Sequence, residues 1–303
     1  KHHADHKHEG RHDGNRNSRV RHLLRLEGPP HEGERGKPAV LRQLARTSLR
    51  ISERTDVQPH MGRHMFRAYA RRCGRHDRRF LLLLRRASQD AWLAERLGKG
   101  HVFRKLDAKE CVFIEYAPLE TAWVPVIGES YLYIYCLWVL AKGHGYGSSL
   151  MEYCIADAKA KEKSGICMLG STKQKSWLSD QSFAKKYGFT TVDTAGEYEL
   201  LALSFDGTHP QFAPNAKKQS IPDTGLTVYY GDQCPYILQR VEKLGAYCAA
   251  EGIECRFIHV ESLSQAKSLP CVFNNWAVFF NGKFITVNQI DPTALKKIIG
   301  RLS

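Results

Sequence analysis

Near its middle, the sequence predicts a strand, a glycine-rich turn and a helix in direct succession. Aromatic and β-branched residues fill positions 131–140, as in a buried strand. Gly143, Gly145 and Gly147 follow at alternate positions, and apolar residues then recur at helical spacing over 150–158. Such a turn lets the backbone approach a ligand and directs the free N–H groups of a helix start towards it. The stretch therefore predicts a phosphate or pyrophosphate site.

The glycine spacing argues against a dinucleotide-binding fold. That fold needs Gly-x-Gly-x-x-Gly and an acidic residue at the end of the next strand. This chain has Gly-x-Gly-x-Gly, and no such acid is evident near 165–171. A tight strand–helix turn that binds no ligand remains an open alternative.

Length and composition indicate a globular protein with room for about two domains. No run of about 18 apolar residues is present, so we predict no membrane span. No signal peptide is recognisable, and the nine cysteines are scattered, mostly within apolar runs. This pattern favours reduced thiols and a cytoplasmic location over a disulfide framework.

Positive charge is concentrated in the first 86 residues. About 22 of the 45 Lys and Arg, but only about 9 of the 31 Asp and Glu, precede Ala87. The rest of the chain is nearly neutral, so we predict no nucleic-acid partner for it. Arginine and histidine dominate the first segment, whereas lysine dominates the remainder.

This composition change suggests that residues 1–86 are not natively folded. We interpret them as sequence translated in a wrong reading frame, or as a fragment end. A basic tail that binds polyanions is one alternative. A metal-binding tract in the His-rich residues 1–8 is another, although a second ligand pair at structural spacing is missing.

From residue 88 the pattern becomes regular. A short helix is expected over 89–97, ended by Gly98. Further elements are expected in this order: strands 101–106 and 111–116, an extended piece 122–127, strand 131–140, a helix to 161, strand 165–170, helix 180–187 and strand 198–205.

Three motifs in this order resemble one known family. The glycine turn resembles motif A of the GNAT superfamily of acetyl-CoA-dependent N-acetyltransferases, and Phe183–Phe189, ending in Gly188-Phe189, resembles its motif B. Residues 112–116 and 136–139 are similar to the YoaP-type members. The resemblance implies an α/β (α+β) fold with a mixed-sheet GNAT domain at 87–206, a linker at 207–224 and a thioredoxin-like domain at 225–303.

The second domain has its own element pattern. Strands are expected at 226–230 and 255–260, a helix over 235–250, a hairpin over 276–286 turning at Asn281-Gly282, and a last helix over 292–302. Cys234 precedes the first of these helices, and a thiol at a helix start is expected to have a lowered pKa. Ile237 replaces the second cysteine of Cys-x-x-Cys, so a dithiol oxidoreductase is not predicted.

The resemblance also implies where acetyl-CoA binds. The backbone of Trp138, Val139 and Leu140 would pair with the pantetheine arm. The turn would bind the pyrophosphate through Lys142, Gly143, His144, Gly145, Tyr146, Gly147 and Ser148. Leu140 departs from the family, because it occupies the Gln or Arg position of motif A.

The catalytic candidates are Glu115, Tyr187 and Cys234. Glu115 is the preferred general base, acting directly or through water. Strand alternation leaves open that it faces solvent instead, and Glu120 and Glu129 are alternates. Tyr187 is the candidate acid, because the position of the family's tyrosine holds Ala184.

These observations predict an N-acetyltransferase that moves the acetyl group of acetyl-CoA to an amine of a small molecule or peptide. The resemblance implies that the amine attacks directly. Acetyl transfer needs an oriented thioester, a base and an oxyanion site. The alternative is a protein that binds acyl-CoA without catalysis, or one that uses Cys234 for monothiol redox chemistry.

Overall fold

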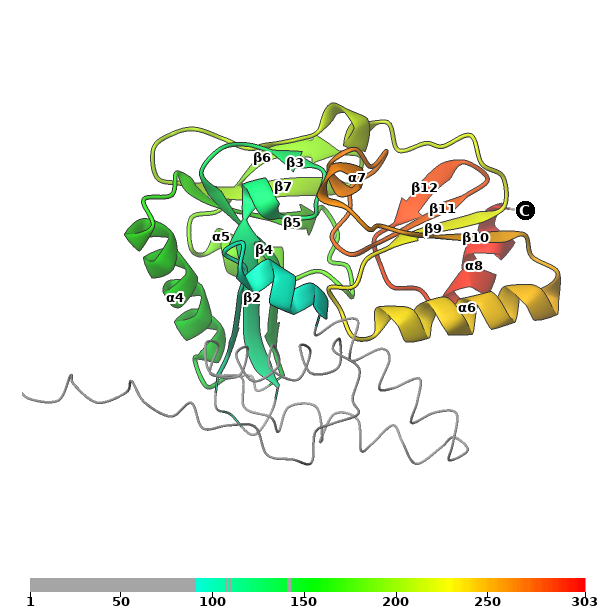
Figure 1. The fold of residues 1–303 in the computed structure, drawn as a ribbon, viewed down its shortest axis with the longest axis horizontal. Coiled ribbons are helices and arrows are strands. Elements are labelled where there is room, and N and C mark those ends of the chain that lie inside the picture. Colours follow the sequence, from blue (N-terminus) through cyan, green and yellow to red (C-terminus); the bar gives the residue numbers. More distant parts are fainter. Residues whose placement is uncertain (1–90, 107, 109–110, 141–142, 303) are drawn as a thin grey trace, which may run out of the picture.

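The computed structural model describes residues 91–106, 108, 111–140 and 143–302, and these form two mixed sheets with helices (Figure 1). The predicted α/β fold class is confirmed. Residues 91–97 are helical, in agreement with the short helix expected there. The segment 1–86 and Lys142 lie outside the described residues.

The first sheet has the strand order β1-β2-β4-β5-β7-β6. Its β4 and β5 strands run parallel, and the other neighbours run antiparallel. The strands are β1 (Val102–Lys105), β2 (Val112–Pro118), β4 (Tyr131–Val139), β5 (Gly165–Ser171), β6 (Thr190–Ala195) and β7 (Tyr198–Ser204).

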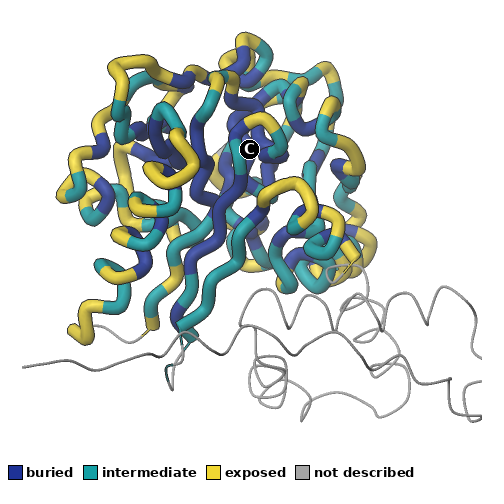
Figure 2. The backbone as a smooth tube through the Cα atoms, turned by 60° about the vertical axis from the view of Figure 1, so that its left-hand side comes forward, coloured by how far each residue is buried: buried dark blue, intermediate teal, exposed yellow. Residues whose placement is uncertain are grey.

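The two faces of this sheet are covered differently. Helix α4 (Tyr146–Ala160) packs its buried Leu150, Met151 and Cys154 on one face. Tyrosines of β4 point to the other face and share a core with Val272 and Val287 of the second sheet region. Figure 2 shows that buried residues run through the strands at the centre of the molecule. The second sheet region therefore covers the face of the first sheet that α4 leaves open.

The second sheet has the order β10-β9-β11-β12. Its strands are β9 (Leu226–Tyr230), β10 (Cys255–His259), β11 (Trp276–Phe280) and β12 (Lys283–Thr286). Helices α6 (Ile237–Glu251) and α8 (Pro292–Leu302) contribute side chains to the core on one face, and α7 (Leu263–Lys267) contributes to the core on the other. The expected succession of strand, helix, strand, hairpin and helix is present, and α7 is an additional helix that the sequence analysis did not predict.

The segment expected to be a linker, 207–224, is ordered and packed. Strand β8 (Gln211–Phe212) pairs with β3 (Val126–Ile127), and a 3-10 helix, η4 (Pro214–Lys217), follows. Its Phe212 and Ala216 are buried in the shared core. The proline-rich, polar sequence suggested a loop, but its few apolar residues are enough to hold it on the first sheet.

Polar contacts join the two sheet regions as well. Lys267 of α7 donates to the carbonyl oxygens of Leu119 and Val126, at 2.8 and 2.9 Å. Asn274 Nδ2 donates to the Tyr135 carbonyl at 3.0 Å. Within the described ranges, no helix is long and apolar enough to cross a membrane.

Candidate active site

Strand β4 separates from its parallel neighbour partway along its length. Pairing with β5 runs only from Tyr131 to Ile134 among the described positions. On its other side, β4 has a bulge against β2, which leaves Tyr135 as the extra residue between paired positions. Beyond it, the Leu137 N–H group donates to Ser179 Oγ at 3.0 Å, on the side from which β5 has separated. The second half of β4 thus presents backbone groups at an open edge.

The glycine turn lies at the end of this open edge. Gly143 and Gly145 have φ values of +82° and +72°, which favour glycine, and a Cβ at either position would meet open space. Helix α4 begins directly afterwards with no side-chain cap. The Ser149 N–H group bonds back to Gly145 O at 3.0 Å, so the N–H groups of residues 146–148 extend outward from the helix start. An anion placed here would meet these donors and the positive end of the helix dipole.

Apolar side chains border the turn. Trp138 is 39% exposed and Leu140 57%, both unusually high for large apolar residues next to a core strand. A Cβ at Gly147 would lie 3.7 Å from the Val139 side chain, so the turn folds back onto the end of β4. His144 stacks on Tyr146 with ring centroids 5.5 Å apart.

Tyr187 lies near the start of α4. Helix α5 (Gln181–Lys185), capped by Asp180, places Phe183 so that a Cβ at Gly147 would contact its ring at 3.4 Å. The Tyr187 ring is 5.2 Å from that of Phe183. The structure therefore brings Tyr187 into the surroundings of the glycine turn.

Glu115 is buried, so the alternative that it faces solvent is wrong. Only 3% of it is exposed, because the segment between β9 and α6 covers this face of β2. One carboxylate oxygen lies 2.9 Å from His101 Nε2, and the other accepts a hydrogen bond from Gln233 Nε2. Neither partner was predicted from sequence, since His101 and Gln233 belong to no recognisable motif. The alternates Glu120 and Glu129 are exposed.

The expected activation of Cys234 is also wrong. Burial raises the pKa of its thiol, and the nearby Glu115 carboxylate raises it further. Hydrogen bonds from Gln289 and the Tyr236 backbone lower the pKa but do not offset the burial. Cys234 is therefore held as a thiol rather than as the reactive thiolate.

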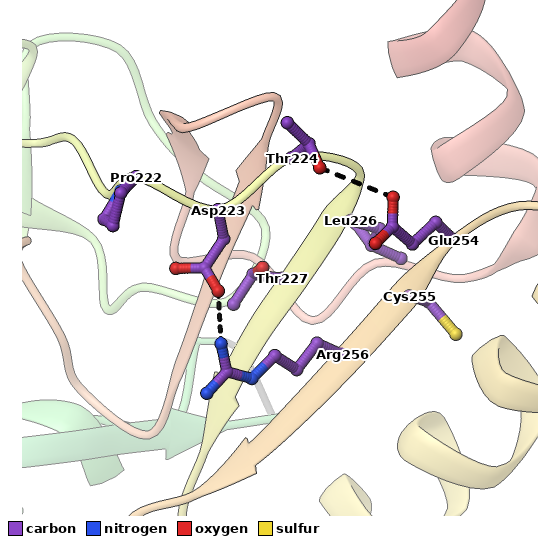
Figure 3. Close-up of a pocket in the computed structure, with 8 residues that line it drawn as sticks. All are labelled: Pro222, Asp223, Thr224, Leu226, Thr227, Glu254, Cys255 and Arg256. Carbon is purple, nitrogen blue, oxygen red and sulfur yellow. Dashed lines mark hydrogen bonds and ion pairs between the residues drawn. The ribbon is translucent and has the colours of Figure 1, made fainter.

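A separate hollow of about 440 Å³ lies at the start of β9 and β10 (Figure 3). Its polar side chains pair with one another: Arg256 bonds Asp223, and Thr224 Oγ1 is 3.4 Å from Glu254 Oε2. None of the predicted site residues lines it. With its charges already paired, this hollow is a weaker candidate than the open edge of β4.

Sequence comparisons identify relatives of this chain. A family model described as YoaP-like matches residues 255–297. The uncharacterized N-acetyltransferase YoaP of Bacillus subtilis is 35% identical over 217 residues, which cover 70% of this chain and 86% of that protein.

Solved structures with similar folds are more distant. A GNAT family acetyltransferase from Brucella melitensis in complex with acetyl-CoA is 18% identical, with 42% of this chain and 73% of that chain covered and a TM-score of 0.28. The PaiA N-acetyltransferase from Thermoplasma acidophilum in complex with coenzyme A is 14% identical, with 55% and 94% covered and a TM-score of 0.31. On the strength of the Bacillus relative, the chain belongs to the GNAT family of N-acetyltransferases and carries the YoaP-like C-terminal region.

Proposed function

We propose that this enzyme transfers the acetyl group of acetyl-CoA to an amine, with the diphosphate of acetyl-CoA bound at residues 142–148. The observation that carries the proposal is the open glycine turn at the uncapped start of α4. Backbone N–H groups of Tyr146, Gly147 and Ser148 would donate to the phosphate oxygens. Lys142 and His144 would add charge pairing.

The open edge of β4 is the proposed binding site of the pantetheine arm and the thioester. N–H groups two residues apart in a strand point to the same edge, so Val139 presents its N–H group on the same side as Leu137. That donor can polarise a thioester carbonyl and stabilise the oxyanion formed during transfer. The exposed Trp138 and Leu140 side chains add apolar surface beside the arm. Leu140 cannot donate the hydrogen bond that Gln or Arg supplies in motif A, so the diphosphate depends more on backbone donors.

Two protons must move during the reaction. The acceptor amine loses one before it attacks the thioester carbon, and the coenzyme A thiolate gains one after the C–S bond breaks. We place the Glu115 carboxylate at the first step and the Tyr187 hydroxyl at the second. Glu115 is one strand away from the bulge of β4, and Tyr187 lies next to Phe183 at the glycine turn.

Binding and turnover can be tested separately. Isothermal titration with acetyl-CoA tests the binding site, and we expect saturable one-site binding. Release of free coenzyme A thiol in the presence of spermidine, lysine or benzylamine tests transfer. Binding without thiol release would favour the second candidate, an acyl-CoA-binding protein without activity. Leu140 and Ala184 support testing it, because both depart from the family's motifs. No heat of binding at millimolar acetyl-CoA would overturn the proposal.

A further inference from the structure

Four side chains, three of them buried, form a hydrogen-bonded chain that crosses from the second sheet region to the first. Asn275 Nδ2 donates to Gln233 Oε1 at 2.5 Å, and Gln233 Nε2 donates to Glu115. The other oxygen of Glu115 lies 2.9 Å from His101 Nε2. His101, Glu115 and Gln233 are each less than a tenth exposed. We call these four residues the interface relay.

The relay ends beside the point where β4 opens. Glu115 pairs with Cys136, the residue that follows the bulged Tyr135. The His101 ring lies 5.6 Å from the Tyr135 ring. His101 therefore lies at the bulge where the open edge of β4 begins, whereas Asn275 lies at the far end of the relay, in the second sheet region.

The hydrogen bonds decide which atom of the relay can take a proton. One Glu115 oxygen accepts a hydrogen bond from Gln233, and the other lies within hydrogen-bond distance of His101 Nε2. An ionised carboxylate can only accept hydrogen bonds, so a neutral His101 donates its Nε2–H group to Glu115. The other ring nitrogen, Nδ1, then has a free lone pair. With His101 neutral, the relay carries one buried negative charge. A proton on Nδ1 converts it to an imidazolium–carboxylate pair of no net charge.

We propose that His101 Nδ1 is the atom that takes the proton of the acceptor amine, and that Glu115 acts through His101. Gln233 and Asn275 are positioning residues by which the second sheet region fixes the Glu115 carboxylate. The amine N–H bond breaks as the Nδ1–H bond forms, and the freed lone pair attacks the thioester carbon. This inference rests on the proposed acetyl transfer and replaces direct action of Glu115.

The test compares variants of the relay with matched controls in the full chain. His101→Gln and Glu115→Gln each remove one member while keeping a polar side chain, and Gln233→Leu removes the contact from the second sheet region. His209→Gln and Gln239→Leu change the same residue types outside the relay. Acetyl-CoA affinity, thermal unfolding and kcat with the best amine of the panel are measured for each, and kcat is followed from pH 6 to 9. Other groups near the relay that titrate or carry charge are Arg96, Tyr135, Cys136 and Cys234.

We expect kcat to fall about 100-fold or more in both His101→Gln and Glu115→Gln, with no further loss in the double variant. Gln233→Leu should lower kcat about tenfold and displace the acidic limb of its pH profile, while acetyl-CoA affinity stays unchanged. Added imidazole should restore part of the activity of His101→Ala, which a purely structural histidine would not allow.

Two results would contradict the relay and differ from a failure of the proposed function. Wild-type transfer with kcat of His101→Gln within twofold of wild type overturns the relay alone. Loss of activity in His101→Ala with intact folding and no response to imidazole also overturns it. A wild-type protein that binds no acetyl-CoA, or binds it without thiol release from any amine, overturns the proposed transfer and the relay together.

Discussion

The units β4–α4 and β9–α6 have the same local plan and different surroundings. Each is a strand with aromatic residues, a short turn and a helix of 15 residues. At the start of α4, Gly145 is exposed and no side chain caps the helix. Before α6, Gln233 is bonded to Glu115 of the other sheet, and Cys234 is held in its thiol form by burial.

A helix start becomes a binding site only where the rest of the chain leaves it open. Free N–H groups exist at both starts as a matter of helix geometry. Around α4 the strands separate and the glycines leave space, whereas the residues before α6 are bonded to Glu115 of the first sheet. The same local pattern therefore supports ligand binding in one unit and domain contact in the other.

The sharpest test of this contrast is Gly145→Glu. A non-glycine residue at φ +72° is strained by about 1–2 kcal/mol, and the new carboxylate would repel the diphosphate at the helix start. We expect acetyl-CoA affinity to fall at least about 100-fold by isothermal titration. Gly252→Glu is the matched control, because Gly252 has φ +64° and open space at the other end of α6. Equal affinities in the two variants would remove the basis for placing the diphosphate at this turn.

The sequence predicts those features of the two units that depend on neighbouring residues in the chain. Apolar periodicity and glycines located both strand–turn–helix units, and Asn281-Gly282 located the hairpin with its observed bounds. Strand β6 was missed, because Thr190, Thr191 and Asp193 make it a polar edge strand without alternation.

The relay and the state of Cys234 could not be predicted, because both depend on packing between distant segments. Glu115 and Gln233 are 118 positions apart in the chain. Alternation along β2 correctly turned Glu115 away from the face that α4 covers. It carried no information about which other part of the chain would lie on the opposite face.

The aromatic neighbours of the two helix starts offer a second test. Tyr187 lies against Phe183 beside α4. Before α6, the ring centroids of Tyr236 and Trp177 are 6.4 Å apart. If Tyr187 returns a proton to the thiolate, Tyr187→Phe should lower kcat at least tenfold and leave acetyl-CoA affinity unchanged. Tyr236→Phe should leave both unchanged. A Tyr187→Phe enzyme with normal kcat would mean that the ring only packs there.

The contact of Lys267 with the first sheet region makes the stability of the fold depend on pH. Burial lowers the pKa of Lys267 from its ordinary 10.5 to about 8. Between these values the unfolded chain binds more protons than the folded one, so this residue makes stability rise with pH from about 8 to 10.5. The effect approaches 1.4 kcal/mol per pH unit at most.

Lys267→Met isolates that contribution. Urea unfolding at pH 7.5, 8.5 and 9.5 should show the wild type gaining stability relative to the variant as pH rises. Ionising thiols and tyrosines affect both proteins alike, so the difference between them reports Lys267. A difference that stays constant across this range would mean that Lys267 keeps its charge without cost in the fold.

Cys234→Ser should have the smallest effect. A thiol with a raised pKa is a poor nucleophile near neutral pH, and serine preserves its size and polarity. We expect acetyl transfer within about twofold of wild type, and slow alkylation of Cys234 by iodoacetamide at pH 7.5 until urea unfolds the chain, as followed by peptide mass spectrometry. Rapid alkylation of the folded protein, or a tenfold loss of transfer, would show that the turn before α6 is chemically active after all. The starts of α4 and α6 would then differ in the kind of ligand that each binds, and not in whether the space around each is open.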